Sequence, residues 1–349
     1  RSKSNNSETK KHNECAAAVT IKLALNSTMV SRSLLVRRTL LLGGGAVRAL
    51  SLDAKKTLGF YGLGTMGKSI AGYLHKYSVE QCGKPALVAS RNASKAEALS
   101  AEIGATYCAD FAELAARCDV VAMCLSTTAD VESVLSSAPL RSGTLIVDCT
   151  SGGPAATVAL GEALRAKGAR LVDAPVSGGP KGAAAGKLVS MVGGSDEDFT
   201  EAYDLLSAWS EKIVKCGPLG AGNAVKAVNN VLNAAHVLLA AEGVVALKKY
   251  GVDPHTALDV INSSSGMSLQ TQRLPAHVLS RKFDFGFQLA LMRKDCVNAK
   301  DLVADLTPSA TLIPEVARLV QAAEAHFGGA VDYTKVAQYL EDQAGCPLS

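Results

Sequence analysis

The sequence predicts an α/β protein with a doubly wound sheet, followed by an all-helical C-terminal domain. Three observations support this. A glycine-rich turn joins a short apolar strand to a helix near residue 60, strands and amphipathic helices then alternate to about residue 180, and the pattern is helical after Gly217 and Pro218. Such alternation is typical of a parallel sheet covered by helices on both faces. We therefore expect a sheet domain over 57–220 and a helical domain over 221–349.

The composition fits a folded enzyme better than a fibrous or disordered chain. Hydrophobic residues make up 48% of the 349 residues and charged residues 19%, which is enough apolar mass for a sizeable core. The nine cysteines are scattered and include no C-x-x-C pair, so we expect free thiols and no metal site. No run of eighteen uncharged apolar residues occurs, so neither a transmembrane helix nor a membrane partner is expected.

The positive charge is concentrated at the N-terminus. Residues 1–56 contain eleven Lys or Arg and three Asp or Glu, whereas the formal net charge of the whole chain is +4. The body of the chain is therefore mildly acidic and lacks the basic surface that nucleic acid requires. From Met29 to Asp53, arginines alternate with leucine runs and no acid intervenes, as in a mitochondrial transit peptide. We expect 1–56 to be a disordered extension or transit peptide, with Met29 as the initiator and the mitochondrial matrix as the destination. A basic tail on a cytoplasmic protein is the alternative.

The glycine turn lies where a dinucleotide-binding fold needs it. The segment "KTLGFYGLGTMGKSIAGYLHK" places G-x-G-x-x-G between a strand and a helix. The first glycine permits the tight turn, the second lets the backbone approach a pyrophosphate, and the third lets helix and strand pack closely. The helix N-terminus then presents free N–H groups to the phosphates. We expect a Rossmann-type sheet whose cofactor contacts include Gly62, Leu63, Gly64, Thr65, Met66 and Gly67.

The end of the second strand favours NADP over NAD. NAD sites usually place an acid about twenty residues after the glycines, where it binds the ribose 2′-hydroxyl. This chain has Ser90, Arg91 and Asn92 there. A guanidinium suits a 2′-phosphate and cannot accept a hydrogen bond from a hydroxyl. We expect Arg91 and Asn92 to contact NADP, with NAD as the alternative.

The alternation then continues through further strands and helices. We expect strands at 105–110, 119–126, 143–152 and 169–179, a glycine-rich hairpin at 179–194 and an acidic helix at 195–212. Ligands of doubly wound sheets bind at the carboxyl ends of the strands. The strand-end residues Leu125, Ser126, Thr150, Ser151 and Ser177 fall on that side, where a nicotinamide would lie. We expect Leu125, Ser126 and Ser151 to contact the cofactor.

Four motifs carry a resemblance to a known family. "GLGTMG", "DAPVSGG", "GNAVKAVNN" and "LMRKD", in this order and spacing, resemble the β-hydroxyacid dehydrogenases. That family includes 3-hydroxyisobutyrate dehydrogenase, tartronate semialdehyde reductase and 6-phosphogluconate dehydrogenase. The similarity extends over about 57–340. It implies NAD(P)-dependent hydride transfer to or from a small β-hydroxy acid or semialdehyde, and assembly as a homodimer or homotetramer.

The segment "GNAVKAVNN" supplies the proposed chemistry. Lys226 and Asn230 are four residues apart, so a helix places them on one face. The family resemblance implies that Lys226 exchanges the hydroxyl proton. Desolvation lowers a lysine's pKa toward neutrality, where it acts as a base or an acid. We expect Asn230 to align the substrate oxygen and Asn229 to assist. A lysine that reaches the solvent from a surface helix is the alternative.

Two further motifs complete the expected site. The N–H groups of "DAPVSGG" and the hydroxyl of Ser177 suit a carboxylate, and the resemblance assigns Ser177, Gly178 and Gly179 to the substrate carboxylate. It places Lys294 near cofactor and substrate, and we expect Asp295 to orient its neighbours. The chain departs from the family at Ser126 and at "CTSGG". It also has Met267 where several relatives have Arg. These positions border the substrate in the family, so the motifs do not identify the substrate. A glyoxylate or succinic semialdehyde reductase and a non-catalytic nucleotide-binding module are the alternatives. Imine reduction would not require Lys226.

Overall fold

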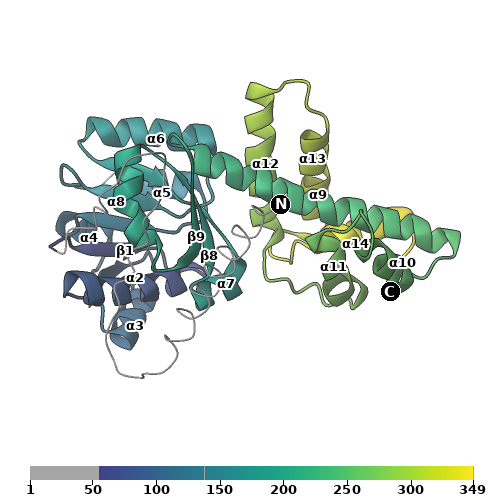
Figure 1. Cartoon of the computed structure of the whole chain (residues 1–349), viewed down its shortest axis with the longest axis horizontal. Helices are drawn as coiled ribbons and strands as arrows, with labels where there is room; N and C mark the ends of the chain where they lie inside the picture. Colours follow the sequence, from purple (N-terminus) through teal and green to yellow (C-terminus); the bar gives the residue numbers. More distant parts are fainter. Residues whose placement is uncertain (1–54, 137, 349) are drawn as a thin grey trace, which may run out of the picture. The chain divides into compact units, whose positions relative to one another are not determined.

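The computed structural model of the chain describes residues 55–136 and 138–348 (Figure 1). The expectation of a transit peptide or disordered extension lies outside these residues, apart from Lys55 and Lys56. Lys56 forms an ion pair with Glu201.

The sheet has the strand order expected for a dinucleotide-binding domain. Its first six strands are parallel and lie in the order β3-β2-β1-β4-β5-β6. The order reverses between β1 and β4, and ligands of doubly wound sheets bind at this switch point. The strands are β1 (Leu58–Tyr61), β2 (Leu87–Ala89), β3 (Thr106–Tyr107), β4 (Val120–Met123), β5 (Leu145–Asp148) and β6 (Arg170–Asp173).

Helices cover both faces of this sheet. Along β4, Val120 and Ala122 belong to one buried apolar cluster, and Val121 and Met123 belong to another. Successive side chains of a strand point to opposite faces, so both faces are buried. This confirms the predicted doubly wound α/β fold. The covering helices include α2 (Gly67–Cys82), α3 (Ala93–Ile103), α4 (Phe111–Arg117), α5 (Thr128–Ser136) and α6 (Pro154–Ala166).

The predicted glycine hairpin at 179–194 is wrong. Strand β7 (Val176–Ser177) pairs antiparallel with β8 (Leu188–Gly193), but helix α7 (Gly179–Ala185) connects them. Pro180 fits the first turn of α7, and the alanines that follow favour a helix. The predicted strand 169–179 is divided into β6 and β7. The predicted acidic helix ends early, as α8 (Asp196–Leu206), and the unpredicted strand β9 (Ser210–Gly217) pairs parallel with β8.

The chain after the sheet is helical, as predicted. Helix α9 (Ala221–Tyr250) is followed by α10 (Pro254–Asn262), α11 (Leu269–Leu274), a π-helix (Pro275–Leu279), α12 (Leu289–Leu306), α13 (Leu312–Phe327) and α14 (Lys335–Ala344). Residues of α9, α12, α13 and α14 form a separate apolar core. Among the described residues, α9 is the only helix long and apolar enough to cross a membrane. The buried face of α9 forms part of this core, and this accounts for the apolar composition of the helix.

Candidate functional site

The glycine loop between β1 and α2 has room for a phosphate group. Gly62 has a φ of 101°, and a Cβ there would lie 2.4 Å from the Cys124 carbonyl oxygen. A Cβ on Gly67 would lie 1.9 Å from the Gly62 carbonyl oxygen. A Cβ on Gly64, in contrast, would meet nothing within 4 Å, and Gly64 is exposed. The turn therefore requires glycine at two positions and leaves the third open, as close approach of a pyrophosphate demands.

The other residues of the loop differ in what they can offer. Leu63 is buried and belongs to the core of the sheet domain, and half-buried Met66 packs against that core. Thr65 is exposed, and no side chain caps the N-terminus of α2. The loop can therefore present Thr65 and the free N–H groups at the start of α2, a suitable arrangement for an anion.

The residues after β2 lie beside this loop. The Gly62 N–H donates to the Ala89 carbonyl oxygen at 3.3 Å, which joins the ends of β1 and β2. Arg91 follows with a side chain that is 72% exposed, and its Nη1 lies 3.3 Å from Asp130 Oδ1. The Oδ1 of Asn92 accepts a hydrogen bond from the Lys95 N–H and begins α3. Arg91 is thus exposed to solvent although it is paired with Asp130, whereas the Asn92 side chain caps α3.

Hydrogen bonds connect the carboxyl ends of β4 and β5. The Leu125 N–H donates to Thr150 Oγ1 at 2.9 Å, and the Thr150 N–H donates to Asp148 Oδ1 at 2.9 Å. Burial raises the pKa of Asp148 to about 7. Ser126 is exposed next to Leu125. The Leu125–Thr150 hydrogen bond thus connects the two strand ends on the side of the sheet that carries the glycine loop.

Two residues that the sequence analysis did not select hold the start of α9 on the sheet. Asp173, at the end of β6, accepts hydrogen bonds from the N–H groups of Gly220 and Asn223, each at 2.8 Å. Burial raises the pKa of Asp173, and these hydrogen bonds oppose the rise. Asn223 Oδ1 accepts from the Gly152 N–H at 2.8 Å. Both residues stand inside quoted motifs, but their partners lie up to 71 residues away, so no local pattern pointed to them.

Lys226 and Asn230 are both buried on one face of α9. Lys226 is 9% exposed and Asn230 is 5% exposed. Burial lowers the pKa of Lys226 from its ordinary value of 10.5, Asp295 raises it in part, and the charge of Lys294 lowers it. In the described part of the chain, the Lys226 amine makes no hydrogen bond. The buried position contradicts the alternative of a lysine that extends from a surface helix into solvent.

Asp295 is the centre of a polar group that includes Asn230. Its carboxylate, 1% exposed on α12, accepts a hydrogen bond from Asn230 Nδ2 at 2.5 Å and from Ser151 Oγ at 2.9 Å. Lys294 Nζ lies 3.1 Å from Asp295 Oδ1 and also donates to the Ser151 carbonyl oxygen. Asn229 donates to Asn230 Oδ1 at 3.0 Å. The structure therefore brings together five predicted site residues from α9, α12 and the loop after β5: Ser151, Lys226, Asn229, Asn230 and Lys294.

The expected carboxylate site lies on a different element. Ser177, Gly178 and Gly179 stand where β7 ends and α7 begins, and both glycines have positive φ, 129° and 63°. No hydrogen bond joins Ser177 to the Lys226 group within the described residues. The connection is indirect: β7 pairs with β8, and a Cβ on Gly222 would lie 2.3 Å from the Met191 carbonyl oxygen of β8. Gly222 is one helical turn before Lys226.

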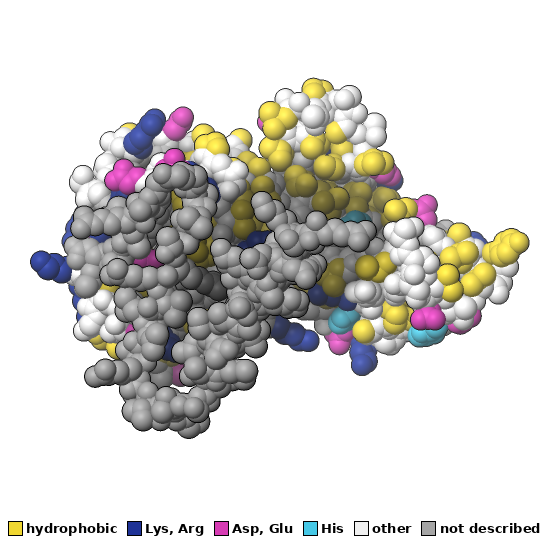
Figure 2. Space-filling model, in the orientation of Figure 1, with side chains coloured by type: hydrophobic (Ala, Val, Ile, Leu, Met, Phe, Trp, Pro, Cys, Tyr) yellow, Lys and Arg dark blue, Asp and Glu magenta, His cyan; other side chains and the backbone are white. Residues whose placement is uncertain are grey.

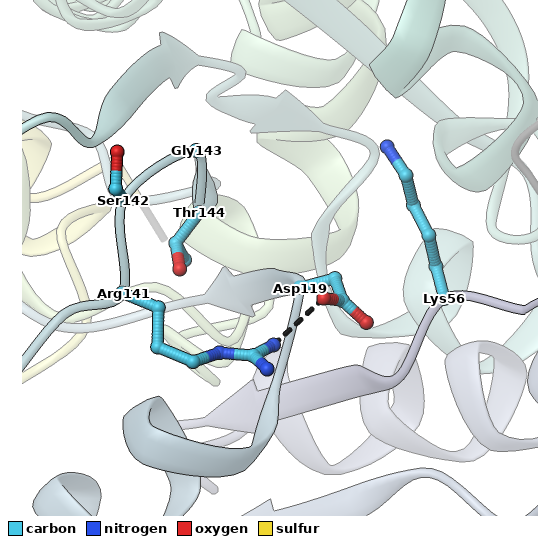
Figure 3. A pocket seen from close by; sticks show the side chains of 6 residues that line it. All are labelled: Lys56, Asp119, Arg141, Ser142, Gly143 and Thr144. Carbon is cyan, nitrogen blue, oxygen red and sulfur yellow. Dashed lines mark hydrogen bonds and ion pairs between the residues drawn. The ribbon is translucent and has the colours of Figure 1, made fainter.

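A separate pocket lies at the other end of the strands, away from the glycine loop (Figure 3). Its residues precede β1, β4 and β5, so it is at the amino ends of the strands. Arg141 and Asp119 form an ion pair there at 2.7 Å. This pocket does not include any predicted site residue. No group of three or more His, Cys, Asp or Glu in the described chain could hold a metal ion.

Two family models match consecutive parts of the chain. Residues 57–217 match the family described as the NAD binding domain of 6-phosphogluconate dehydrogenase. Residues 220–340 match the family described as NAD-binding of NADP-dependent 3-hydroxyisobutyrate dehydrogenase.

Individual relatives cover most of the chain. The 2-(hydroxymethyl)glutarate dehydrogenase of Eubacterium barkeri is 32% identical over 84% of this chain and 97% of its own length. The mitochondrial 3-hydroxyisobutyrate dehydrogenase of Drosophila melanogaster is 32% identical over 71% of this chain and 78% of its own. The structure of Mycobacterium tuberculosis 3-hydroxyisobutyrate dehydrogenase with L-serine has a TM-score of 0.73 at 29% identity, covering 82% of this chain and 99% of that one.

Proposed function

The chain belongs to the β-hydroxyacid dehydrogenase family and is an NAD(P)-dependent dehydrogenase of CH–OH groups, and we propose that it transfers a hydride between NADP(H) and a small β-hydroxy acid or its semialdehyde. The observation that carries the proposal is the buried amine of Lys226, one turn from Asn230 and without a hydrogen-bond partner among the described residues. A buried amine with a lowered pKa is suited to proton exchange.

The roles of the protein groups follow from their contacts. The bound nicotinamide supplies the hydride acceptor for alcohol oxidation. In that direction neutral Lys226 takes the hydroxyl proton, and in the reverse direction its ammonium returns it. Asn230 Nδ2 has two hydrogens and gives one to Asp295, so the other is available for the substrate oxygen. Ser177, Gly178 and Gly179 would hold the substrate carboxylate.

The substrate class can be narrowed by the chemistry of the relatives. The names of two relatives, 2-(hydroxymethyl)glutarate and 3-hydroxyisobutyrate dehydrogenase, describe substrates with a hydroxymethyl group next to the carbon that bears a carboxylate. L-Serine, present in the mycobacterial structure, has the same arrangement. We test the proposal by measuring NADP reduction with these three compounds and with lactate, whose hydroxyl is one carbon closer to the carboxylate. Turnover of lactate alone, or of none of the four, would contradict it.

The preference for NADP rests on Arg91, which is exposed beside the glycine loop. Replacement of Arg91 by Asp removes a charged hydrogen bond to the 2′-phosphate and adds repulsion. Charged hydrogen bonds contribute roughly 1.5–3 kcal/mol, so NADPH affinity should fall at least about tenfold, while NADH affinity stays level or improves. Titration of cofactor fluorescence measures both. A wild-type enzyme that binds NADH more tightly than NADPH would overturn the NADP assignment.

Assembly as a homodimer or homotetramer is supported by an apolar stripe on α9. Val225, Leu232 and Leu239 recur every seven residues and are 44%, 50% and 73% exposed. Further exposed apolar side chains lie on the helical domain (Figure 2). Apolar patches of this kind commonly mark contacts between copies of a chain. Leu232→Glu should shift the sedimentation mass toward the monomer, whereas Val79→Glu on α2 should not. A monomeric wild-type protein would contradict the proposal.

The mitochondrial matrix is the proposed location. The basic, acid-poor segment from Met29 and the mitochondrial relative in Drosophila melanogaster support it. A reporter fused to residues 29–56 should enter mitochondria, and a diffuse cytosolic signal would argue for the cytoplasmic alternative.

A further inference from the structure

The guanidinium of Arg91 is shared with a carboxylate of the chain itself. Arg91 Nη1 lies 3.3 Å from Asp130 Oδ1 on α5, and the two side chains are 72% and 27% exposed. A pair this long and this exposed is weak and can open. Arg91 is therefore available to a cofactor phosphate, but only in competition with Asp130.

The position of Asp130 is fixed independently of Arg91. Thr127 Oγ1 donates to Asp130 Oδ2 at 2.8 Å, and the Asp130 N–H donates to Thr127 Oγ1 at 3.1 Å. These contacts form the first turn of α5, where the helix dipole also favours a negative charge. The carboxylate therefore stays in place when Arg91 turns toward a ligand.

The Arg91–Asp130 pair is located next to the glycine loop. Tyr61 directly precedes Gly62, and the charge of Arg91 lowers the pKa of Tyr61 against the larger opposing effect of burial. The hydrogen bond from the Gly62 N–H to the Ala89 carbonyl oxygen holds the chain that leads to Arg91 against the same loop. A ribose of a dinucleotide whose pyrophosphate lies on Gly64 would thus be close to both charges.

We propose that Asp130 limits the selectivity of the enzyme for NADP(H) over NAD(H). The inference rests on the proposed use of NADP. A 2′-phosphate must displace Asp130 from Arg91 and then lies near a fixed negative charge, which weakens its binding. A 2′-hydroxyl encounters neither penalty, because it carries no charge and can donate a hydrogen bond to the carboxylate. The pair therefore permits both cofactors and moderates the preference that Arg91 alone would give.

The test is the ratio of dissociation constants for NADH and NADPH, measured by fluorescence titration of the purified enzyme without substrate. Asp130→Asn keeps an oxygen that accepts from Thr127 and removes only the charge. The ratio should rise about three- to tenfold through tighter NADPH binding, as expected for loss of one nearby surface charge and its ion pair. Glu132→Gln, an exposed change on the same helix, should alter the ratio less than about twofold. Thermal unfolding checks that both variants remain folded.

The outcomes separate this inference from the proposed cofactor. An unchanged ratio in Asp130→Asn, or an equal rise in Glu132→Gln, would overturn the role of Asp130. In an Arg91→Ala background, Asp130→Asn should raise the ratio by less than it does with Arg91 present, since only repulsion is left to relieve. A wild-type protein that prefers NADH would refute the NADP assignment, and the response to Asp130→Asn would still decide whether Asp130 sets the ratio.

Discussion

Replacement of Lys226 by Met should lower turnover by roughly 10²–10⁴-fold, the usual contribution of general acid–base catalysis. The variant keeps a side chain of similar length and removes the buried amine. Affinity for NADPH should persist, because the glycine loop and Arg91 are located on other elements. Rapid kinetics with a β-hydroxy acid, together with cofactor titration, measures the two effects separately.

The stability of Lys226→Met shows whether a loss of turnover is due to misfolding. Burial of the Lys226 side chain disfavours its charge, whereas Met fills a similar space without that cost. The free energy of unfolding of Lys226→Met should therefore equal or exceed that of the wild type. Asn230→Ala is the matched variant one turn away, and it should raise the Michaelis constant more than it lowers turnover. Near-normal turnover in folded Lys226→Met enzyme would remove Lys226 from the mechanism.

Replacement of Asp295 by Asn should have the second largest effect. Asn keeps the size of the side chain but removes the charge beside Lys294 and one of the acceptors for Asn230 and Ser151. Misalignment of Asn230 should lower kcat/KM by up to about 10²-fold, and the imperfectly paired groups should lower the free energy of unfolding by about 1–3 kcal/mol. Steady-state kinetics and urea denaturation measure both quantities.

The pH dependence of turnover distinguishes a positioning role of Asp295 from a purely structural one. Its charge raises the pKa of Lys226, so its removal should move the ionisation that controls turnover to lower pH. Asp301→Asn, an exposed substitution on the same helix, controls for the loss of a negative charge. An Asp295→Asn enzyme that loses stability but keeps wild-type turnover and pH dependence would show that Asp295 has only a structural role.

Local patterns were sufficient where one element carries the information. The glycine turn and the apolar strands predicted the doubly wound sheet, and the four-residue spacing of Lys226 and Asn230 placed both on one face of α9. The elements α7 and β9 were not predicted. Helix α7 begins in a glycine-rich segment that equally suits a turn, and β9 follows α8 after only three residues. Such short segments contain too few residues to show the periodicity of a helix or a strand, so their composition alone did not identify them.

Contacts between distant segments could not be predicted from one sequence. Asp295 meets Asn230 across 65 residues and Ser151 across 144, and Asp173 meets Gly220 across 47. No periodicity links such positions, because the fold alone brings them together. The sequence therefore predicted candidate residues for the chemistry, while the structure was needed to find the buried carboxylates of Asp173 and Asp295, which hold the start of α9 and Asn230.

The pH dependence of turnover in the oxidation direction tests the role of Lys226 most directly. Only the neutral amine can accept the hydroxyl proton, so turnover of the wild type should rise as the pH increases through the pKa of Lys226. Burial lowers this pKa, so the rise should occur below the ordinary lysine value of 10.5. The same ionisation should be present in Asn230→Ala and absent from the residual activity of Lys226→Met. Its persistence in Lys226→Met would show that another group exchanges the proton.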